Sequence, residues 1–443
     1  MNPDNTFLWG VSSSSAQTEG AVDTDGKGNS IWDEFVKQKR KINDGSRNLS
    51  GTDFYNRYRE DIDLIADLKI SNFRFSLSWP RILPQGKGAI NQKGLDFYDR
   101  IVDACLEKNI TPWITLYHWD LPQALEQSGG WTNREIINWF SDYVNICTKR
   151  LGDRVKNWMV LNEPMAFCGA GYFLGVHAPG KRGRNNFVAA AHHAVLATSI
   201  GAGIIRNRVP GAYIGSTYSL SHISPYKINV QDIEAAQRVD DLLNKFFLNP
   251  ALGKGYPLKN LGFLNSIEKM ILPGDEKIMK AELDFVGVQN YTREIIKHNL
   301  LTPFLKASMV SAKKRNVPYT EMGWEVYPEA IYQVLKNLSG IEGMPPIIVT
   351  ENGAAFADVV AADGSIHDTA RKNYLEANIQ QVLKAKQEGV DVKGYFAWSL
   401  TDNFEWAEGY RPRFGLVHVD YEQNLKRTVK ESGLWYKGMI SDK

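Results

Sequence analysis

The chain has 443 residues, of which 43% are hydrophobic and 23% charged. Its 52 Lys and Arg nearly balance its 50 Asp and Glu, which leaves a formal charge of +2. This composition excludes a disordered chain, a collagen and a disulfide-rich scaffold, and it favours a globular protein. The near-neutral charge provides no basic surface for nucleic acid or for an anionic membrane, so neither is expected as a partner.

The N-terminal sequence, MNPDNTFLWG, shows no basic segment followed by the apolar run of about 7 to 15 residues that defines a signal peptide. Three cysteines, Cys105, Cys147 and Cys168, lack CxxC spacing and are expected to be small buried side chains in a reducing compartment. Both observations predict a cytoplasmic location. The longest apolar stretch, residues 189–205, contains His192 and His193, which favours a packed helix over a membrane span.

Short β-rich segments alternate with helical ones along the whole chain. From the N-terminus, strands are expected at residues 7–14, 72–79, 111–118, 157–162, 212–220, 284–291, 346–350 and 392–400. Amphipathic helices are expected between them, at residues 54–69, 95–108, 134–151, 187–207, 231–244, 328–338 and 369–388. In the first helix Phe54, Tyr58, Ile62, Ile65 and Leu68 recur every three or four residues, which is helical periodicity.

Several of the expected strands are near-continuous apolar runs, typical of parallel strands covered on both faces. The repeated β–α alternation predicts one α/β domain, residues 1–443, folded as a single (β/α)8 TIM barrel. An open doubly wound sheet is the alternative. Four connections are longer than minimal loops and are expected as long loops at the C-terminal face of the barrel: residues 15–71, 163–186, 221–283 and 292–345.

Polar and aromatic side chains collect where seven of the eight expected strands end. The C-terminal ends of the strands form the active-site face of such a barrel, so these side chains are expected to converge. In chain order they are Gln17, Arg74, His118, Asn162, Glu163, Tyr291, Glu351, Trp398, Glu405 and Trp406.

The kinds of residue at these ends point to a carbohydrate. HExxH, a Walker loop, a GxGxxG after a strand and a GxSxG elbow are all absent from the sequence, so neither a metal nor a cofactor is expected. Amide and carboxylate groups suit vicinal hydroxyls, and tryptophan rings cover the C–H face of a pyranose. Two carboxylates on different strands can flank a glycosidic bond, although these patterns do not say which carboxylate has which role.

The motifs at these positions carry a family resemblance. They include Phe73-Arg-Phe-Ser-Leu-Ser-Trp, His118-Trp-Asp-Leu-Pro, Leu161-Asn-Glu-Pro, Thr350-Glu-Asn-Gly and Asp402-Asn-Phe-Glu-Trp, in this order. With these motifs the chain resembles glycoside hydrolase family 1, the β-glucosidase and β-galactosidase family of retaining barrel enzymes, over essentially its whole length.

The resemblance implies a role for each matching residue. Glu163 matches the general acid/base, and Glu351 matches the nucleophile that forms a glycosyl-enzyme intermediate. Arg74 and Tyr291 match neighbours of the nucleophile, and Trp324 resembles the platform for the aglycone. The remaining matches are to residues that bind the non-reducing sugar: Asn162 at its 2-hydroxyl, Gln17, His118, Glu405 and Trp406 at the other hydroxyls, and Trp398 as the ring on which the sugar stacks.

Five positions bear on specificity. Gln289 stands where the family commonly has Asn, which implies altered positioning around the acid/base. Met165 stands where many members have Trp, which implies a softer wall on the aglycone side. Branches that act on 6-phosphorylated sugars usually have Ser, Lys and Tyr where this chain has Glu405, Pro412 and Phe414. No lysine stands there for a phosphate, so an unmodified sugar is expected.

These observations predict an exo-acting, retaining β-glycosidase with a small β-glycoside or oligosaccharide as its substrate. The first expectation is a β-glucosidase acting on terminal β-D-glucosyl residues, with galactosyl or fucosyl residues as further substrates. A transglycosylating β-glycosidase and a catalytically idle sugar-binding homologue are the alternatives. The sequence gives no indication of the oligomeric state.

Overall fold

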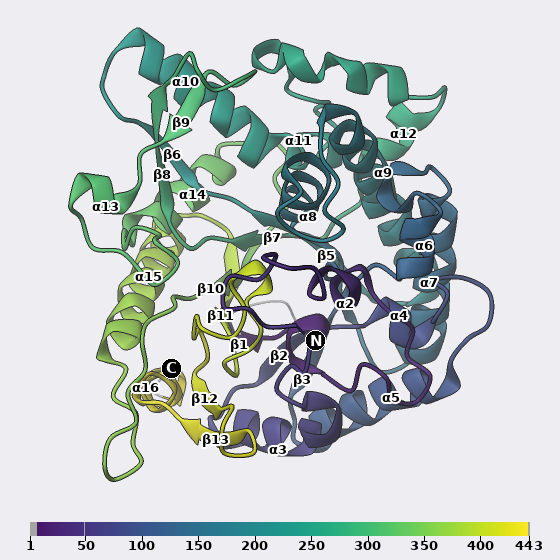
Figure 1. Ribbon diagram of the computed structural model, residues 1–443, viewed down its shortest axis with the longest axis vertical. Helices are drawn as coiled ribbons and strands as arrows, with labels where there is room; N and C mark the ends of the chain where they lie inside the picture. Colours follow the sequence, from purple (N-terminus) through teal and green to yellow (C-terminus); the bar gives the residue numbers. More distant parts are fainter. Residues whose placement is uncertain (1–6, 48, 442–443) are drawn as a thin grey trace.

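The computed structural model describes residues 7–47 and 49–441, and a closed barrel of eight parallel strands lies at its centre (Figure 1). Strand β1 pairs with both β11 and β2, which closes the ring. The closed barrel confirms the predicted fold and excludes the open sheet. In order around the ring the strands are β1 (Leu8–Ser12), β11 (Val392–Trp398), β10 (Ile347–Asn352), β7 (Phe285–Gln289), β5 (Tyr213–Ser219), β4 (Asn157–Asn162), β3 (Thr111–Tyr117) and β2 (Asn72–Ser76).

Helices surround the barrel, and all of the long ones except α16 (Glu431–Ser441) lie where the hydrophobic periodicity predicts a helix (Figure 1). The expected helix at residues 231–244 is shorter, because it changes at Asp241 into a π-helical segment, Asp241–Lys245. The long helices are α3 (Phe54–Asp67), α5 (Gln92–Glu107), α7 (Ile136–Leu151), α9 (Arg184–Arg208), α10 (Val230–Asp240), α14 (Glu329–Ser339), α15 (Thr369–Gln387) and α16 (Glu431–Ser441). Shorter ones are α1 (Ser15–Thr18), α2 (Ile31–Phe35), α4 (Trp79–Ile82), α6 (Gln123–Gln127), α8 (Pro164–Cys168), α11 (Leu248–Ala251), α12 (Asp275–Met279) and α13 (Ala312–Arg315).

The long connections contain strands that the sequence patterns do not predict. A three-stranded sheet, β6 (His222–Pro225), β8 (Arg293–His298) and β9 (Ala307–Met309), lies beside α10 at the edge of the molecule (Figure 1). A hairpin, β12 (Val417–Asp420) and β13 (Lys426–Val429), precedes α16. The connections expected to be long loops are therefore partly ordered into secondary structure.

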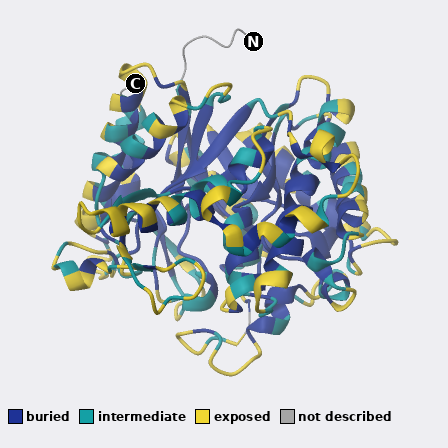
Figure 2. Ribbon diagram, turned by 90° about the horizontal axis from the view of Figure 1, so that it is seen from above, coloured by how far each residue is buried: buried dark blue, intermediate teal, exposed yellow. Residues whose placement is uncertain are grey.

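One layer of the barrel interior is filled by large side chains, and the buried strands stand at the centre of the molecule in Figure 2. Trp113, Met159, Phe285, Ile348 and Phe396 form this layer. Glycines make room for the rings: a Cβ atom at Gly10 would lie 2.3 Å from the ring of Phe396. The filled layer leaves the carboxyl ends of the strands as the place for a cavity.

Helix α9 contains the apolar stretch that the sequence singled out. Among the described residues it is the one helix long and apolar enough to span a membrane, but 78% of its most apolar window is buried inside the protein. His192 pairs with Asp275 at 3.0 Å, and His193 contacts the carbonyl oxygen of Trp131 at 2.8 Å. These contacts are those of a packed helix, as predicted. Cys105, Cys147 and Cys168 are buried and free, also as predicted.

Candidate active site

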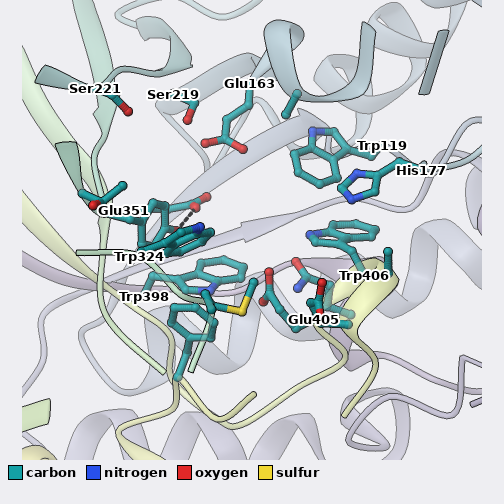
Figure 3. A pocket seen from close by; sticks show the side chains of 18 of the residues that line it. Trp119, Glu163, His177, Ser219, Ser221, Trp324, Glu351, Trp398, Glu405 and Trp406 are labelled. Carbon is teal, nitrogen blue, oxygen red and sulfur yellow. Dashed lines mark hydrogen bonds between the residues drawn. The ribbon is translucent and has the colours of Figure 1, made fainter. Parts of the chain in front are cut away.

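A cavity of about 310 Å³ opens at the carboxyl ends of the barrel strands (Figure 3). Most of the predicted site residues line it: Gln17, His118, Glu163, Tyr291, Trp324, Glu351, Trp398, Glu405 and Trp406. Arg74 and Asn162 are fully buried and hydrogen-bond to residues of this lining. The structure thus brings all of the predicted site residues together.

Glu351 lies within β10 and is held by three hydrogen-bond donors. Arg74 forms an ion pair with its Oε1 atom, and Gln289 Nε2 donates to the same oxygen at 2.7 Å. The hydroxyl of Tyr291 donates to Oε2 at 2.6 Å. Burial raises the pKa of Glu351, while Arg74 and Tyr291 act in the opposite direction. Both carboxylate oxygens are therefore fixed in orientation, and their negative charge is stabilised.

The expected end of the seventh strand, residue 350, is wrong by two residues. The pairing of β10 with its neighbours continues through Glu351, opposite Gln289, and Asn352, opposite Ala397. Asn352 supports this extension because its Nδ2 donates to the carbonyl oxygen of Asn290 at 2.7 Å. Glu351 thus stands on a strand, which holds it more rigidly than a loop would.

Glu163 follows directly after β4 and has a left-handed backbone, with φ of 45°. Such a conformation is uncommon outside glycine and costs about 1 to 2 kcal/mol, so the surrounding fold must hold it. The backbone N–H of Glu163 donates to the carbonyl oxygen of Thr217 at 2.9 Å. Burial raises the pKa of the Glu163 carboxyl to about 8, and the charge of Glu351 adds to this effect. Glu163 is therefore protonated at neutral pH.

Asn162 connects the two sides of the site. Its Oδ1 atom accepts hydrogen bonds from Arg74, from Gln289 at 2.7 Å and from Thr217 at 2.9 Å. These donors fix the orientation of the amide, so its Nδ2 donates to His118 Nε2 at 2.9 Å. One N–H of Asn162 remains available to a ligand.

The same contact fixes the tautomer of His118. Because Nε2 accepts from Asn162, the proton of the neutral ring lies on Nδ1. Burial lowers the pKa of His118 well below its usual range, which keeps the ring neutral. The Nδ1 atom is buried and has no hydrogen-bond partner among the described residues. His118 therefore offers one N–H donor to a ligand.

Gln17 offers the complementary group. Its Nε2 donates to Asn403 Oδ1 at 3.0 Å and to the carbonyl oxygen of Phe404 at 2.8 Å. Its Oε1 atom is buried and without a partner in the described part of the chain. Burial raises the pKa of the nearby Glu405 carboxyl to about 8, and the charge of Glu351 contributes further. Gln17 and His118 thus present an acceptor and a donor, the pair that a hydroxyl group needs.

Aromatic rings enclose the cavity (Figure 3). Trp406 packs against Trp119 with ring centroids 4.4 Å apart, and its ring is stacked with that of His118 at 5.9 Å. Trp324 packs against Tyr291 at 5.3 Å. These rings provide the flat apolar faces that cover the C–H side of a pyranose.

Several lining residues are not predicted by the sequence. Ser219 and Ser221 come from the end of β5, the one strand end where no polar cluster stands out, and His177 and Glu294 come from the long connections. Serine is common in loops, so these residues give no distinctive pattern. A buried location, which lowers the pKa of His177 to about 4, is visible only in the folded chain.

Of the two departures from the family pattern near Glu163 and Glu351, Gln289 contacts the site residues and Met165 lies outside the cavity. Gln289 donates to Glu351 and to Asn162, the residue before Glu163, at 2.7 Å each. Its side chain at the end of β7 is long enough to reach the neighbouring strands on both sides. Ala166 lines the cavity, whereas Met165 lies beside Tyr218 in a separate small pocket.

Within residues 7–47 and 49–441 no group of three or more His, Cys, Asp or Glu side chains is placed to hold a metal ion. The chemical groups of the cavity are carboxyl groups, among them those of Glu163 and Glu351, together with an amide, imidazoles and indoles. A closed (β/α)8 barrel with this set at its strand ends has the architecture of a glycosidase.

The chain belongs to glycosyl hydrolase family 1, whose sequence profile matches residues 3–443. It is 44% identical to β-glucosidase A of Thermotoga maritima over 98% of this chain and 97% of that protein. It is also 44% identical to the 1,4-β-D-glucan glucohydrolase of Thermotoga neapolitana, over the same shares of the two chains. The solved structure of the Thermotoga maritima β-glucosidase in complex with deoxynojirimycin superposes with a TM-score of 0.95, at 44% identity, and covers 99% of this chain and 98% of that chain.

Proposed function

We propose that the protein is an exo-acting, retaining β-glycosidase that removes terminal β-D-glucosyl residues. The observation that carries this proposal is the pair of buried carboxyl groups, Glu163 and Glu351, which face one cavity but differ in their hydrogen-bond partners. Glu351 is held by an arginine and two further donors, whereas Glu163 has a pKa of about 8 and keeps its proton. A nucleophile and an acid catalyst need this difference.

In the first step the Glu351 carboxylate attacks the anomeric carbon. Glu163 donates its proton to the glycosidic oxygen, the bond from that oxygen to the anomeric carbon breaks, and the aglycone leaves as an alcohol. The product is a glycosyl ester on Glu351. Arg74, Gln289 and Tyr291 hold the attacking oxygens in place before the substrate arrives.

In the second step water releases the sugar. The ester on Glu351 carries no charge, so the repulsion that helped to raise the pKa of Glu163 is gone and that pKa falls. Glu163, now a carboxylate, takes a proton from water, and the water oxygen attacks the anomeric carbon. Glu351 departs as a carboxylate and Glu163 is again protonated. Two inversions at the anomeric carbon retain its configuration.

The free hydrogen-bonding atoms support the binding of one terminal sugar. The remaining N–H of Asn162 would contact the 2-hydroxyl, and His118 Nδ1 and Gln17 Oε1 would contact hydroxyls farther round the ring. Glu405 and Trp406 would complete these contacts, and Trp398 would cover the apolar face of the sugar. A ligand in this position would satisfy buried polar atoms that otherwise lack partners.

The relatives support glucose as the sugar, because those compared are named for action on β-glucosides or β-glucans. Small oligosaccharides such as cellobiose are accordingly proposed as substrates. We also propose a cytoplasmic location, which is supported by three buried cysteines that form no disulfide with one another.

A substrate panel tests the proposal. Nitrophenyl β-glucoside, β-galactoside and β-fucoside are compared with the corresponding α-glucoside, and the anomer first released is identified by NMR. We expect the β-glucoside to be hydrolysed fastest, with β-glucose as the first product. Resistance of all three β-glycosides, or release of α-glucose, would rule the proposed function out.

A further inference from the structure

The order of strands around the barrel divides the cavity into two parts. Glu163 follows β4 and Glu351 lies on β10, and these strands separate β5 and β7 from β11, β1, β2 and β3. Apart from Asn162 on β4, the proposed sugar-binding residues stand at the ends of the second group. In Figure 3 two of them, Glu405 and Trp406, lie at the opposite end of the cavity from Ser221. The ends of β5 and β7 therefore face the leaving group.

The wall on this side is polar and carries a carboxyl group. Ser219 is the last residue of β5 and Ser221 comes soon after it, while Thr292 and Glu294 come after β7. Glu294 lies on β8, where it is partly buried beside Ile223 of β6, and its side chain lines the cavity. No hydrogen bond or ion pair joins the Glu294 carboxyl to any other described residue.

A second carboxylate nearby differs from Glu294, because arginine side chains pair with it. Glu325, next to the predicted aglycone platform Trp324, accepts two hydrogen bonds from Arg293 at 2.8 Å and one from Arg315 at 2.6 Å. This cluster attaches the Trp324 segment to β8 and satisfies its own charges. Glu294 forms no hydrogen bond or ion pair with this cluster, so its carboxyl remains available to a ligand in the cavity.

The surroundings of Glu294 favour a hydroxyl as its partner. Burial raises the pKa of Glu294 to about 7, so at neutral pH the group can both donate and accept a hydrogen bond. The positive charge of Arg315 and the negative charge of Glu325 also act on Glu294, in opposite directions. The nearby ring of Trp324 provides a flat face for the C–H side of a second pyranose.

We propose that Glu294 is a specificity-determining residue that hydrogen-bonds the hydroxyls of a second glycosyl unit in the leaving-group position, with Ser219, Ser221 and Thr292 as its neighbours. The proposal rests on the β-glucosidase function proposed above. It predicts that the contact with Glu294 raises kcat/KM for a glucosyl disaccharide.

The test compares two leaving groups in matched variants. The kcat/KM values for cellobiose and for nitrophenyl β-glucoside are measured for the natural protein, Glu294→Gln, Glu294→Ala and the exposed control Glu342→Gln. Both substrates share the sugar in the non-reducing position, so their ratio reports on the leaving group alone. The ratio of cellobiose to nitrophenyl activity is expected to fall roughly 10- to 100-fold in Glu294→Ala, less in Glu294→Gln, and not at all in the control.

The outcomes separate the two proposals. An unchanged ratio in Glu294→Ala, with both activities present, would overturn the role of Glu294 and leave the glucosidase function standing. Absence of both activities in the natural protein would overturn the function itself, and the role of Glu294 with it. The kcat/KM of a β-glucoside with an ammonium-bearing aglycone is measured in the same variants. If Glu294→Ala lowers it more than it lowers kcat/KM for cellobiose, Glu294 is a charge partner, which contradicts the hydroxyl assignment.

Discussion

Glu163 and Glu351 carry the same carboxyl group, and their neighbours give them different properties. Three donors reach Glu351, among them Arg74, whereas burial and the negative charge of Glu351 act on Glu163 in the same direction. The family motifs predict both residues and their roles. They also predict Arg74 and Tyr291 as neighbours of Glu351. The contact of Gln289 with Glu351 could not be predicted from sequence, because it depends on which side chains of other strands meet in the folded barrel.

The pKa of Glu163 leads to a prediction about pH. The protonated form of Glu163 is the active acid, so kcat/KM for a substrate with a poor leaving group should fall as the pH rises through about 8. In Glu163→Gln this decline should disappear, because the amide does not titrate, and activity should be lower by about 10²- to 10⁴-fold. Initial rates across pH 5 to 10 provide the measurement; a Glu163→Gln variant with an unaltered alkaline limb would contradict the assignment.

Gln289 leads to a second prediction. Replacing it with Leu removes the N–H group that contacts both Glu351 and Asn162 at 2.7 Å. Loss of a donor destabilises the carboxylate form, so the pKa of Glu351 should rise and the acid limb of the profile should move to higher pH. We expect kcat/KM to fall roughly 10- to 100-fold.

Exposed Gln423→Leu serves as the matched control for this substitution. A purely structural role for Gln289 would lower activity without moving the acid limb. Unaltered position of that limb in Gln289→Leu would therefore rule out a direct effect on Glu351.

At the scale of elements, hydrophobic patterns predicted all eight barrel strands but not the small sheet beside α10. Barrel strands are buried on both faces and appear as apolar runs, whereas β6 has four partly exposed residues and β9 only three residues. Such short segments carry too little pattern to be distinguished from loop. Their order depends on packing against α10, through Ile296, Ala307 and Val239 among others.

A buried ion cluster joins the last elements of the chain to the active-site loops. Lys430, just before α16, pairs with Asp402 at 2.7 Å and also with Asp358, and all three side chains are inaccessible to solvent. Asp402 accepts a further bond from Arg413 at 2.8 Å. Since Asp402 begins the segment that leads to Glu405, the cluster fixes one part of the cavity from behind.

Removal of this lysine should therefore destabilise the protein. In Lys430→Met two buried carboxylates lose a shared partner, and the free energy of unfolding should fall by about 3 to 5 kcal/mol. The exposed Lys426→Met on β13 should change it very little. Urea denaturation measures both variants, and equal stability of the two would show that the cluster contributes nothing.

The whole molecule is closed by contacts between distant parts of the chain. Strand β1 pairs with β11, the hydroxyl of Tyr436 in α16 donates to the carbonyl oxygen of Gly10 at 2.9 Å, and Arg427 pairs with Asp61 at 2.9 Å. A barrel that closes in this way loses its continuous sheet when either end is removed. These contacts support the proposal that residues 1–443 form one domain.

One domain should unfold in one step. Scanning calorimetry of the full chain is expected to give a single heat-absorption peak, with the loss of tryptophan fluorescence at the same temperature. Two resolved peaks, or fluorescence that changes well before the heat is absorbed, would indicate separate units.

The near-zero net charge of the molecule agrees with an uncharged substrate, which needs no attracting field to reach the cavity. The 12 tryptophans of the chain serve both the core and the cavity. Trp113 and Trp158 are buried in the barrel, while Trp119, Trp324, Trp398 and Trp406 line the site.

The covalent intermediate on Glu351 is the central claim, and trapping it is the most direct test. The protein is incubated with a 2-deoxy-2-fluoro-β-glucoside bearing a good leaving group, digested, and analysed by peptide mass spectrometry. We expect inactivation with one fluoroglucosyl group per chain, attached to Glu351 in the peptide that contains Thr350-Glu-Asn-Gly. Attachment at any other residue, or turnover without a covalent adduct, would contradict the proposed mechanism.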